Sequence, residues 1–129
     1  MAMTDRNKKI KAARASDAGA EGARGEALAA SYLEARDYTV LERNYRCRSG
    51  EIDLIARRGS RLAFVEVKTR KNTLRGEPRE FVTAAKQRRL HKAALHYLMC
   101  HPEAENLLLR FDVAEIIGNA IRYTEDAFE

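Results

Sequence analysis

The stretch RLAFVEVKTR, residues 61 to 70, has the composition of a buried β-strand, yet it carries a glutamate and a lysine two residues apart. Successive strand side chains point to opposite faces of a sheet. One face would carry Ala63, Val65, Val67 and Thr69, and the other Leu62, Phe64, Glu66, Lys68 and Arg70. Glu66 and Lys68 are therefore neighbours on one face. An ion pair on a solvated face would account for them, and a functional site would require a partner strand.

That partner is GEIDLIA, residues 50 to 56, joined to the first stretch by the turn residues Arg58-Gly59-Ser60. Alternation places Ile52, Leu54 and Ala56 on one face, and Glu51, Asp53 and Ile55 on the other. In an antiparallel hairpin of these two strands, Asp53 and Glu66 can approach each other on one side of the sheet. Two adjacent carboxylates repel unless a cation lies between them. Mg²⁺ takes oxygen ligands from one or two carboxylates and keeps waters, so the pair is a candidate metal site.

Lys68 would lie one pleat beyond Glu66, beside such a metal site. Phosphodiester hydrolysis requires a nucleophilic water and a positive charge near the phosphate as negative charge develops on it. A metal ion held by the two carboxylates would activate the water and neutralise charge on the phosphate, and the lysine would add a positive charge beside it. The pattern therefore favours metal-dependent hydrolysis of a phosphodiester, with Lys68 orienting the nucleophile or stabilising the transition state.

The remaining pattern predicts one domain of the α/β class, with a mixed sheet flanked by helices in the order α-β-β-β-α-β. We expect residues 1–20 to form a flexible basic arm and residues 21–129 to form the single domain. Helical spacing of apolar residues predicts helices over 22–36 and 80–100, with a basic loop between 71 and 79. The predicted strands are 38–46, 51–57 and 61–70, which form an antiparallel meander, and a final hairpin of 109–117 with the short 120–124.

Two charged residues lie on the apolar faces of the predicted helices. Glu26 falls on the apolar arc of the first helix, where it either has a partner or is a first-turn acid that favours the helix dipole. Lys86 lies between Val82 and Leu90 on the apolar stripe of the second helix. A lysine in such a place must extend to solvent or meet an anion.

The whole chain has a formal net charge of +5, and its positive charge is concentrated in one segment. From Lys68 to Lys92 there are nine basic residues and two acids. Such clustering is typical of nucleic-acid binding and equally of a solvated basic face. The candidate DNA-backbone ligands are Arg70, Lys71, Arg75, Arg79, Arg88 and Arg89.

Several classes of protein do not fit the sequence. No apolar run approaches the roughly 18 residues of a membrane span, and no hydrophobic segment follows the charged N-terminus. We therefore expect a cytoplasmic protein that does not bind membranes. Two isolated cysteines describe neither a disulfide framework nor a zinc site. Three histidines spaced by five residues would not share a helix face as metal ligands.

The motifs taken together resemble a known family. Asp53 followed by Glu66-Val67-Lys68 is similar to the D…(D/E)-x-K site of the restriction-endonuclease-like, or PD-(D/E)XK, superfamily. The fuller set GEIDLIA, FVEVKTR, a helix carrying Lys86, and RFDV at 110 to 113 resembles the YraN-like family. Members are small bacterial proteins predicted to be endonucleases related to archaeal Holliday junction resolvases. The resemblance extends from about residue 22 to residue 117.

The resemblance implies a Mg²⁺- or Mn²⁺-dependent DNA endonuclease with branched, Holliday-junction-like DNA as its candidate substrate. Asp53 and Glu66 match the metal-binding acids, and Lys68 matches the catalytic lysine. Glu26 matches a first-helix glutamate near the metal, and Lys86 matches a basic or polar residue on the following helix. Ile52 stands where the superfamily's name has proline, which many members lack. A homodimer is left open, because resolvase-like relatives often pair while these residues show no dimer signature.

Two other interpretations remain open. The chain could be a non-catalytic nucleic-acid-binding module of the same fold that recruits DNA or a protein. Alternatively, Asp53, Glu66, Lys68 and Lys86 could form a salt-bridge network with no further role, although four converging charges are costly in a fold. Ile121, Tyr123 and Phe128 near the C-terminus could serve an interface or cap the sheet.

Overall fold

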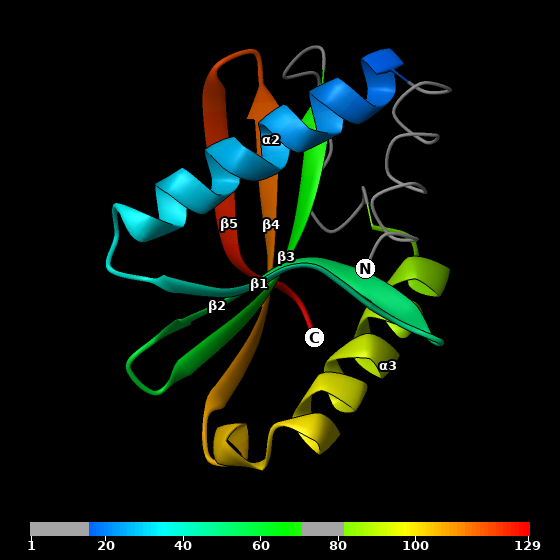
Figure 1. Ribbon diagram of the computed structural model, residues 1–129, viewed down its shortest axis with the longest axis vertical. Coiled ribbons are helices and arrows are strands. Elements are labelled where there is room, and N and C mark those ends of the chain that lie inside the picture. Colours follow the sequence, from blue (N-terminus) through cyan, green and yellow to red (C-terminus); the bar gives the residue numbers. More distant parts are fainter. Residues whose placement is uncertain (1–15, 71–81) are drawn as a thin grey trace, which may run out of the picture.

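A five-stranded mixed sheet forms the centre of the computed structural model, which describes residues 16–70 and 82–129 (Figure 1). Strands β1, β2 and β3 form an antiparallel meander, β3 pairs with β4 in parallel, and β4 pairs with β5 in antiparallel. The predicted α/β class and mixed sheet are confirmed. The elements are α2 (Ser16–Glu34), β1 (Thr39–Cys47), β2 (Gly50–Arg58), β3 (Arg61–Arg70), α3 (Ala84–Cys100), the 3₁₀ turn η2 (Pro102–Ala104), β4 (Leu108–Ile117) and β5 (Ala120–Phe128).

The order agrees with the order expected for a restriction-endonuclease-like core, and the differences lie at the ends of elements. Helix α2 begins at Ser16, before the predicted start at 22, and residues 1–15 of the predicted arm lie outside the described part. Strand β5 extends to Phe128 rather than ending at 124. Helix α3 begins at Ala84 after the N-cap Thr83, whose side chain accepts a hydrogen bond from the Lys86 amide.

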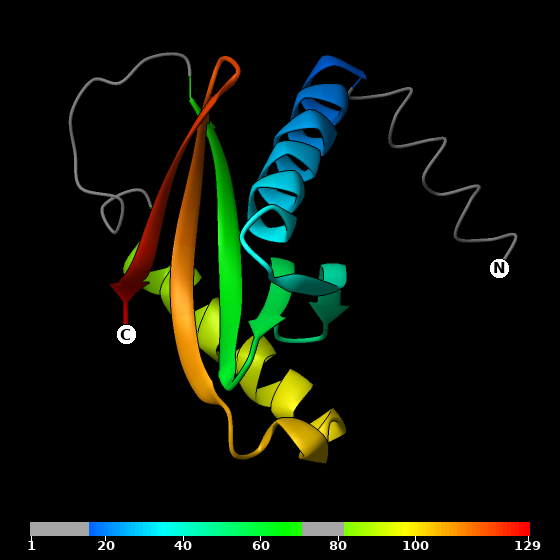
Figure 2. The ribbon, with the colours of Figure 1, turned by 90° about the vertical axis from the view of Figure 1, so that its left-hand side faces the viewer.

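The two helices cover opposite faces of the sheet, as Figure 2 shows. Val65 and Ala63 of β3 pack with α2, and Phe64 and Leu62 pack with α3, as the alternation predicted. Burial of these apolar side chains on both faces is the main source of stability for such a three-layer arrangement.

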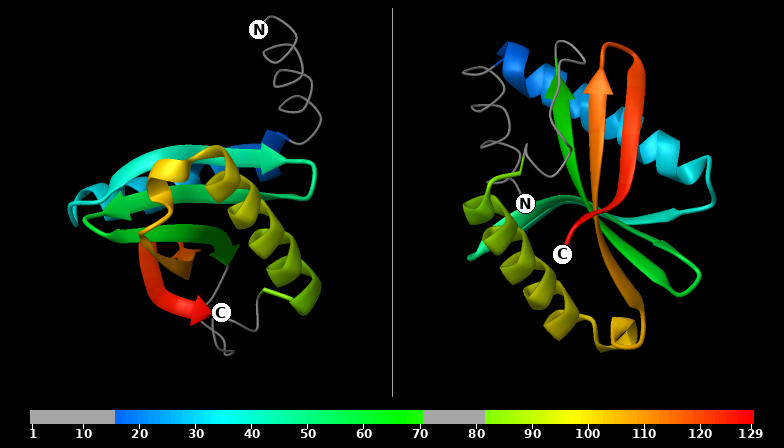
Figure 3. Two further views of the ribbon diagram at one scale, coloured as in Figure 1. Left: turned by 90° about the horizontal axis from the view of Figure 1, so that it is seen from below. Right: turned by 180° about the vertical axis from the view of Figure 1, so that it is seen from behind.

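The β1–β2 hairpin departs from the regular sheet. The paired residues of β2 and β3 end at Leu54 and Val65, whereas β1 and β2 stay paired as far as Cys47 and Gly50. Beyond that point the hairpin passes across α3 (Figure 3). Ile52, predicted to share a face with Leu54, therefore packs in the α3-side cluster instead.

The C-terminal apolar residues cap the sheet rather than stand free. Phe128 is buried in the α3-side cluster, and Ile121 and Tyr123 pack against the α2-side cluster. The Tyr123 ring stacks on Tyr32 of α2, with the ring centroids 5.1 Å apart. Among the described residues, no helix is long and apolar enough to cross a membrane.

Candidate active site

Asp53 and Glu66 lie together where β2 separates from β3. With no paired β2 residue beyond Leu54, the Asp53 side chain takes the place of a backbone partner: its Oδ2 accepts a hydrogen bond from the Val67 amide at 2.8 Å. The Asp53 carboxyl also lies close enough to the Glu66 carboxyl for their charges to interact. The predicted approach of the two acids is confirmed.

The surroundings of this acidic pair disfavour ionisation of both carboxyls at once. Burial raises the pKa of Asp53 to about 7, and repulsion from Glu66 adds to the rise. The hydrogen bond from the Val67 amide and the charge of Lys86 act in the opposite direction. Glu66 is itself buried, with 5% of its surface exposed. An additional cation at this pair would therefore be strongly favoured.

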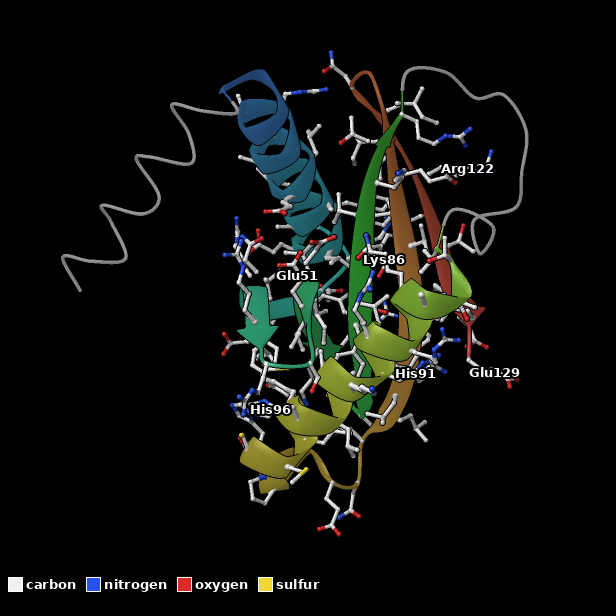
Figure 4. The ribbon with its side chains drawn as sticks, turned by 90° about the vertical axis from the view of Figure 1, so that its right-hand side faces the viewer. Glu51, Lys86, His91, His96, Arg122 and Glu129 are labelled. Atoms are coloured by element: carbon white, nitrogen blue, oxygen red, sulfur yellow. The ribbon has the colours of Figure 1, made fainter. Side chains whose placement is uncertain are left out.

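Lys86 supplies one cation to the pair. It projects from the first turn of α3 toward the sheet (Figure 4), and its Nζ forms an ion pair with Glu66 Oε2. Burial alone would lower the pKa of Lys86, but the hydrogen bond and charge of Glu66 outweigh it, so that the pKa is raised. A lysine on an apolar stripe must extend to solvent or meet an anion, and Lys86 meets the Glu66 carboxylate.

Glu26 approaches the pair from α2. The helix comes close to β3 at Gly25, where an added Cβ would lie 2.8 Å from Thr69 Oγ1. Glu26 is partly buried and accepts a hydrogen bond from Asn44 Nδ2 at 3.1 Å. Burial raises the pKa of Glu26 against the effect of that hydrogen bond, and the charge of Asp53 adds to the rise. Glu26 therefore has the partner that its position on an apolar arc required.

Asn44 is a site residue that the sequence analysis missed. Its φ of 53° lies in the left-handed region, which asparagine tolerates better than most residues. This backbone turn within β1 lets the amide reach Glu26. Asparagine is depleted in strands, so its presence inside YTVLERNYR was the available signal.

Lys68 lies on the same face of β3 as Glu66 but does not contact the acidic pair. It is exposed, and it makes no hydrogen bond or ion pair with any other residue in ranges 16–70 and 82–129. Its strand neighbour in register is Glu115 of β4, which is instead paired with Arg70 and Arg122. The four-charge network envisaged from the sequence is therefore reduced to the Glu66–Lys86 pair and its contact with Asp53.

The predicted DNA-backbone ligands fall into three groups. Arg70 is 13% exposed, and its guanidinium lies 2.8 Å from the buried carboxylate of Glu115, so this side chain has a structural role in the fold. Arg88 and Arg89 are exposed on α3. Lys71, Arg75 and Arg79 lie outside the described residues.

The acidic pair fits a divalent ion that prefers oxygen ligands and keeps its waters. Asp53 and Glu66 offer carboxylate oxygens, the ligands that Mg²⁺ and Mn²⁺ select. Within the described ranges, no three histidine, cysteine or acidic side chains converge in an arrangement that could hold a metal. Asp53 and Glu66 would be two acidic ligands of such an ion, and water or a substrate oxygen could take further positions.

Comparison with known proteins places the chain in a family. Residues 25–116 match the model of a family described as "Uncharacterised protein family UPF0102". The chain is 46% identical to a UPF0102 protein of Geotalea uraniireducens, with 84% of this chain and 88% of the relative covered. It is 45% identical to one of Lachnoclostridium phytofermentans, covering 84% and 92%, and 50% identical to one of Geobacter sulfurreducens, covering 84% and 88%. The chain therefore belongs to the UPF0102 family, the YraN-like family that its motifs resemble.

Proposed function

We propose that this protein is a Mg²⁺- or Mn²⁺-dependent DNA endonuclease of the PD-(D/E)XK superfamily. The observation that carries the proposal is the close approach of the Asp53 and Glu66 carboxyls at the divergence of β2 and β3, with Lys86 bound to Glu66 and Lys68 one pleat away. Acids and lysines in this arrangement provide a cation site next to free positive charge, which is what phosphodiester hydrolysis requires.

The two acids would hold the divalent ion. When bound, that ion lowers the pKa of a coordinated water and neutralises charge on the phosphate. The backbone hydrogen bond from the Val67 amide fixes the Asp53 carboxylate, and burial fixes Glu66, so neither acid must reorganise to bind the ion.

The lysines would act on the substrate. Lys68 is exposed and unpaired among the described residues, so its ammonium is available to orient the nucleophilic water or stabilise negative charge on the phosphate. Lys86 is already bound to Glu66 and would keep the anionic pair compatible with a nearby phosphate. Glu26, held by Asn44, would lie at the edge of the site and receive a proton or hydrogen-bond a water there.

DNA is the proposed substrate because α3, whose Lys86 meets the acidic pair, also carries exposed basic residues. Arg88 and Arg89 follow Lys86 on α3 and would contact backbone phosphates without reading sequence. Recognition of the backbone favours selection by DNA shape. Branched DNA, including four-way junctions, is accordingly the substrate to test first.

One observation favours a second function, a non-catalytic module that recruits nucleic acid. The Lys86 ammonium already neutralises Glu66, so the acidic pair is satisfied in part without a metal. In that case the same basic surface would bind DNA and no bond would be broken.

A cleavage assay separates the two functions. End-labelled linear, flapped and four-way-junction DNA would be incubated with Mg²⁺ or Mn²⁺ and the wild type, Glu66→Gln, or Lys68→Ala. Matched controls are Glu34→Gln, an exposed acid at the end of α2, and Arg61→Ala, an exposed cation at the other end of β3.

The nuclease proposal predicts cutting by the wild type and both controls, and its loss in both site variants. Equal cutting by all five proteins would reveal a contaminating nuclease. DNA binding without cutting in every condition would establish the recruiting module instead.

A further inference from the structure

A basic cleft adjoins the acidic pair, between the β1–β2 turn and the first half of α3. Its volume is about 460 Å³. Four cations line it, with one acid and an apolar floor: Arg46, Arg48, Lys86, Arg89, Glu51 and Leu90. Figure 4 shows Glu51 and Lys86 on the same side of the molecule, at the start of β2 and at the beginning of α3. The excess of positive charge indicates an anionic ligand.

The walls of the cleft are held together by direct backbone contact. A Cβ built on Gly50 would lie 2.6 Å from the Arg89 carbonyl oxygen, so the turn lies against α3 at a distance that only glycine permits. Farther along, the Tyr45 hydroxyl hydrogen-bonds His96 Nδ1 at 2.6 Å. The cations on the turn and those on the helix therefore keep a fixed spacing.

Two of the four cations in the cleft have no internal partner among the described residues, and a third is held only by an exposed ion pair. Arg46 forms an ion pair with Glu51 at 3.3 Å, but both side chains are about 60% exposed, so solvent weakens the pair. The side chains of Arg48 and Arg89 are exposed and form no hydrogen bond or ion pair with the rest of the described chain. Two or three arginines are therefore available to a ligand.

The cleft is continuous with the acidic pair through Lys86, which both lines the cleft and binds Glu66. An anion in the cleft would thus lie beside a phosphate at the cation site of Asp53 and Glu66. Ligands with regularly repeated negative charges next to one another are nucleic-acid strands.

We propose that this cleft is a backbone-phosphate subsite, in which Arg46, Arg48 and Arg89 hold the strand that runs on from the phosphate at the acidic pair. This inference rests on the proposed function and specifies it. The site takes a phosphodiester within a polynucleotide strand, with the chain continuing toward the β1–β2 turn. Neither Arg46 nor Arg48 was singled out from the sequence, because only the passage of the hairpin across α3 brings them to the site.

The test measures binding of fluorescein-labelled single-stranded and duplex oligonucleotides in EDTA, over a range of salt concentrations, without any need for cleavage. The Arg46→Ala/Arg48→Ala variant is compared with Arg43→Ala/Arg61→Ala, which removes the same charge from two exposed arginines outside the cleft. For the cleft variant, the plot of log affinity against log salt should become less steep by about two, one for each phosphate that is no longer neutralised. Its affinity should fall alike for all sequences. The control should keep the wild-type slope.

Four outcomes are informative. A wild-type slope in the cleft variant, or an equal loss in the control, overturns the subsite. If the wild type cuts DNA and the cleft variant binds and cuts equally well, the subsite fails while the nuclease stands. If the slope falls as expected but the wild type never cuts, the subsite stands and the nuclease fails. Failure of the wild type to bind any of these oligonucleotides overturns the subsite, whereas the cleavage assay with Mg²⁺ or Mn²⁺ decides the nuclease.

Discussion

The ammonium of Lys86 forms an ion pair with the carboxylate of Glu66. Of the acidic pair Asp53 and Glu66, Glu66 is the acid to which no described backbone amide donates a hydrogen bond. Asp53 is held by the Val67 amide, whereas Glu66 is held by Lys86. A lysine from α3 therefore neutralises part of the charge that a divalent ion would otherwise neutralise. Lys86 and a metal at this pair would compete electrostatically for the same acids, which makes the lysine the natural point at which to test the metal site.

Lys86→Met should lower the stability of the metal-free protein and increase the stabilisation that Mg²⁺ brings. Without metal, the buried Glu66 carboxylate loses its partner, and the free energy of unfolding should fall by about 1–3 kcal/mol. With Mg²⁺ present, the gain in melting temperature should exceed that of the wild type, because the competing ammonium is gone. Melting curves with and without Mg²⁺ measure both effects.

Lys92→Met, an exposed lysine on the same helix, is the control and should change neither quantity. A Mg²⁺-induced gain that is the same in Lys86→Met and in the wild type would show that no divalent ion binds near Glu66. A gain that persists in Asp53→Asn would lead to the same conclusion.

The metal-free protein should lose stability as pH rises between about 4 and about 7. Burial and the charge of Glu66 raise the pKa of Asp53 from 3.8 to about 7 in the folded state. In this window the folded protein holds a proton that the unfolded chain releases, so the free energy of unfolding falls as pH increases. One such group contributes at most about 1.4 kcal/mol per pH unit.

Denaturant unfolding in EDTA across that window measures the slope. Asp53→Asn should remove this group's contribution, and saturating Mg²⁺ should reduce it, because the cation favours the ionised acid. Unchanged pH dependence in Asp53→Asn would contradict the assignment to Asp53.

How far the sequence predicted this fold depends on how regular each pattern is. The period of two in EIDLIAR and RLAFVEVKTR indicated a hairpin, and its register brought Asp53 to Glu66. Helix α2 was predicted too short because its first residues, rich in alanine and glycine, carry no apolar period. The packing of Ile52 on α3 was missed because it follows from the divergence of β2 from β3, which is a tertiary effect.

The sequence predicted the acidic residues of the candidate site better than its basic residues. Lys86 was found because a charge interrupts an apolar stripe. Arg70 has the same charge as its neighbours in sequence, and only the fold shows that it pairs with the buried Glu115. Arg89 was predicted from the sequence, whereas Asn44, Arg46 and Arg48 were not, because they depend on a left-handed backbone residue and on a hairpin that crosses a helix, and neither feature has a sequence period.

Gly25→Ala and Gly22→Ala should have opposite effects on stability, although both lie in α2. A Cβ at Gly25 would lie 2.8 Å from Thr69 Oγ1. Either the Thr69 side chain or the helix must then shift, at a cost of about 1–3 kcal/mol. At Gly22 nothing lies within 4 Å, and alanine there should stabilise the helix by up to about 1 kcal/mol. Urea unfolding compares the two. Thr69→Ala should restore much of the loss in Gly25→Ala, and failure to do so would place the strain elsewhere.

Asn44→Gly and Asn44→Ala should separate the backbone role of Asn44 from its hold on Glu26. The φ of Asn44 is 53°. Alanine in this left-handed conformation is strained by about 1–2 kcal/mol, whereas glycine is not, so only the alanine variant should lose stability appreciably. Both variants remove the hydrogen bond to Glu26. In the proposed nuclease both should therefore lower kcat to the level of Glu26→Gln. If the glycine variant kept full kcat, Asn44 would have a backbone role alone.

Asp112 of the RFDV segment should support the fold rather than the chemistry. Its carboxylate is fully buried on the α2 side of the sheet, where it accepts hydrogen bonds from Arg110, the Tyr123 hydroxyl and the Asp126 amide. Asp112→Asn removes the buried counter-charge of Arg110, which then keeps only its ion pair with the half-exposed Glu125, and it should cost about 3–5 kcal/mol. Tyr123→Phe, which removes one hydrogen bond, should cost only about 1 kcal/mol.

The decisive measurement for Asp112 compares stability with cleavage. At a temperature where Asp112→Asn remains folded, cleavage per folded molecule should equal that of the wild type, because the Asp112 side chain lies on the face of the sheet opposite to the Glu66–Lys86 pair. Cleavage lost without loss of folded protein would instead tie the network of Arg110 and Asp112 to the reaction. Comparing the two quantities thus distinguishes an acid that is buried to hold the sheet together from one that takes part in catalysis.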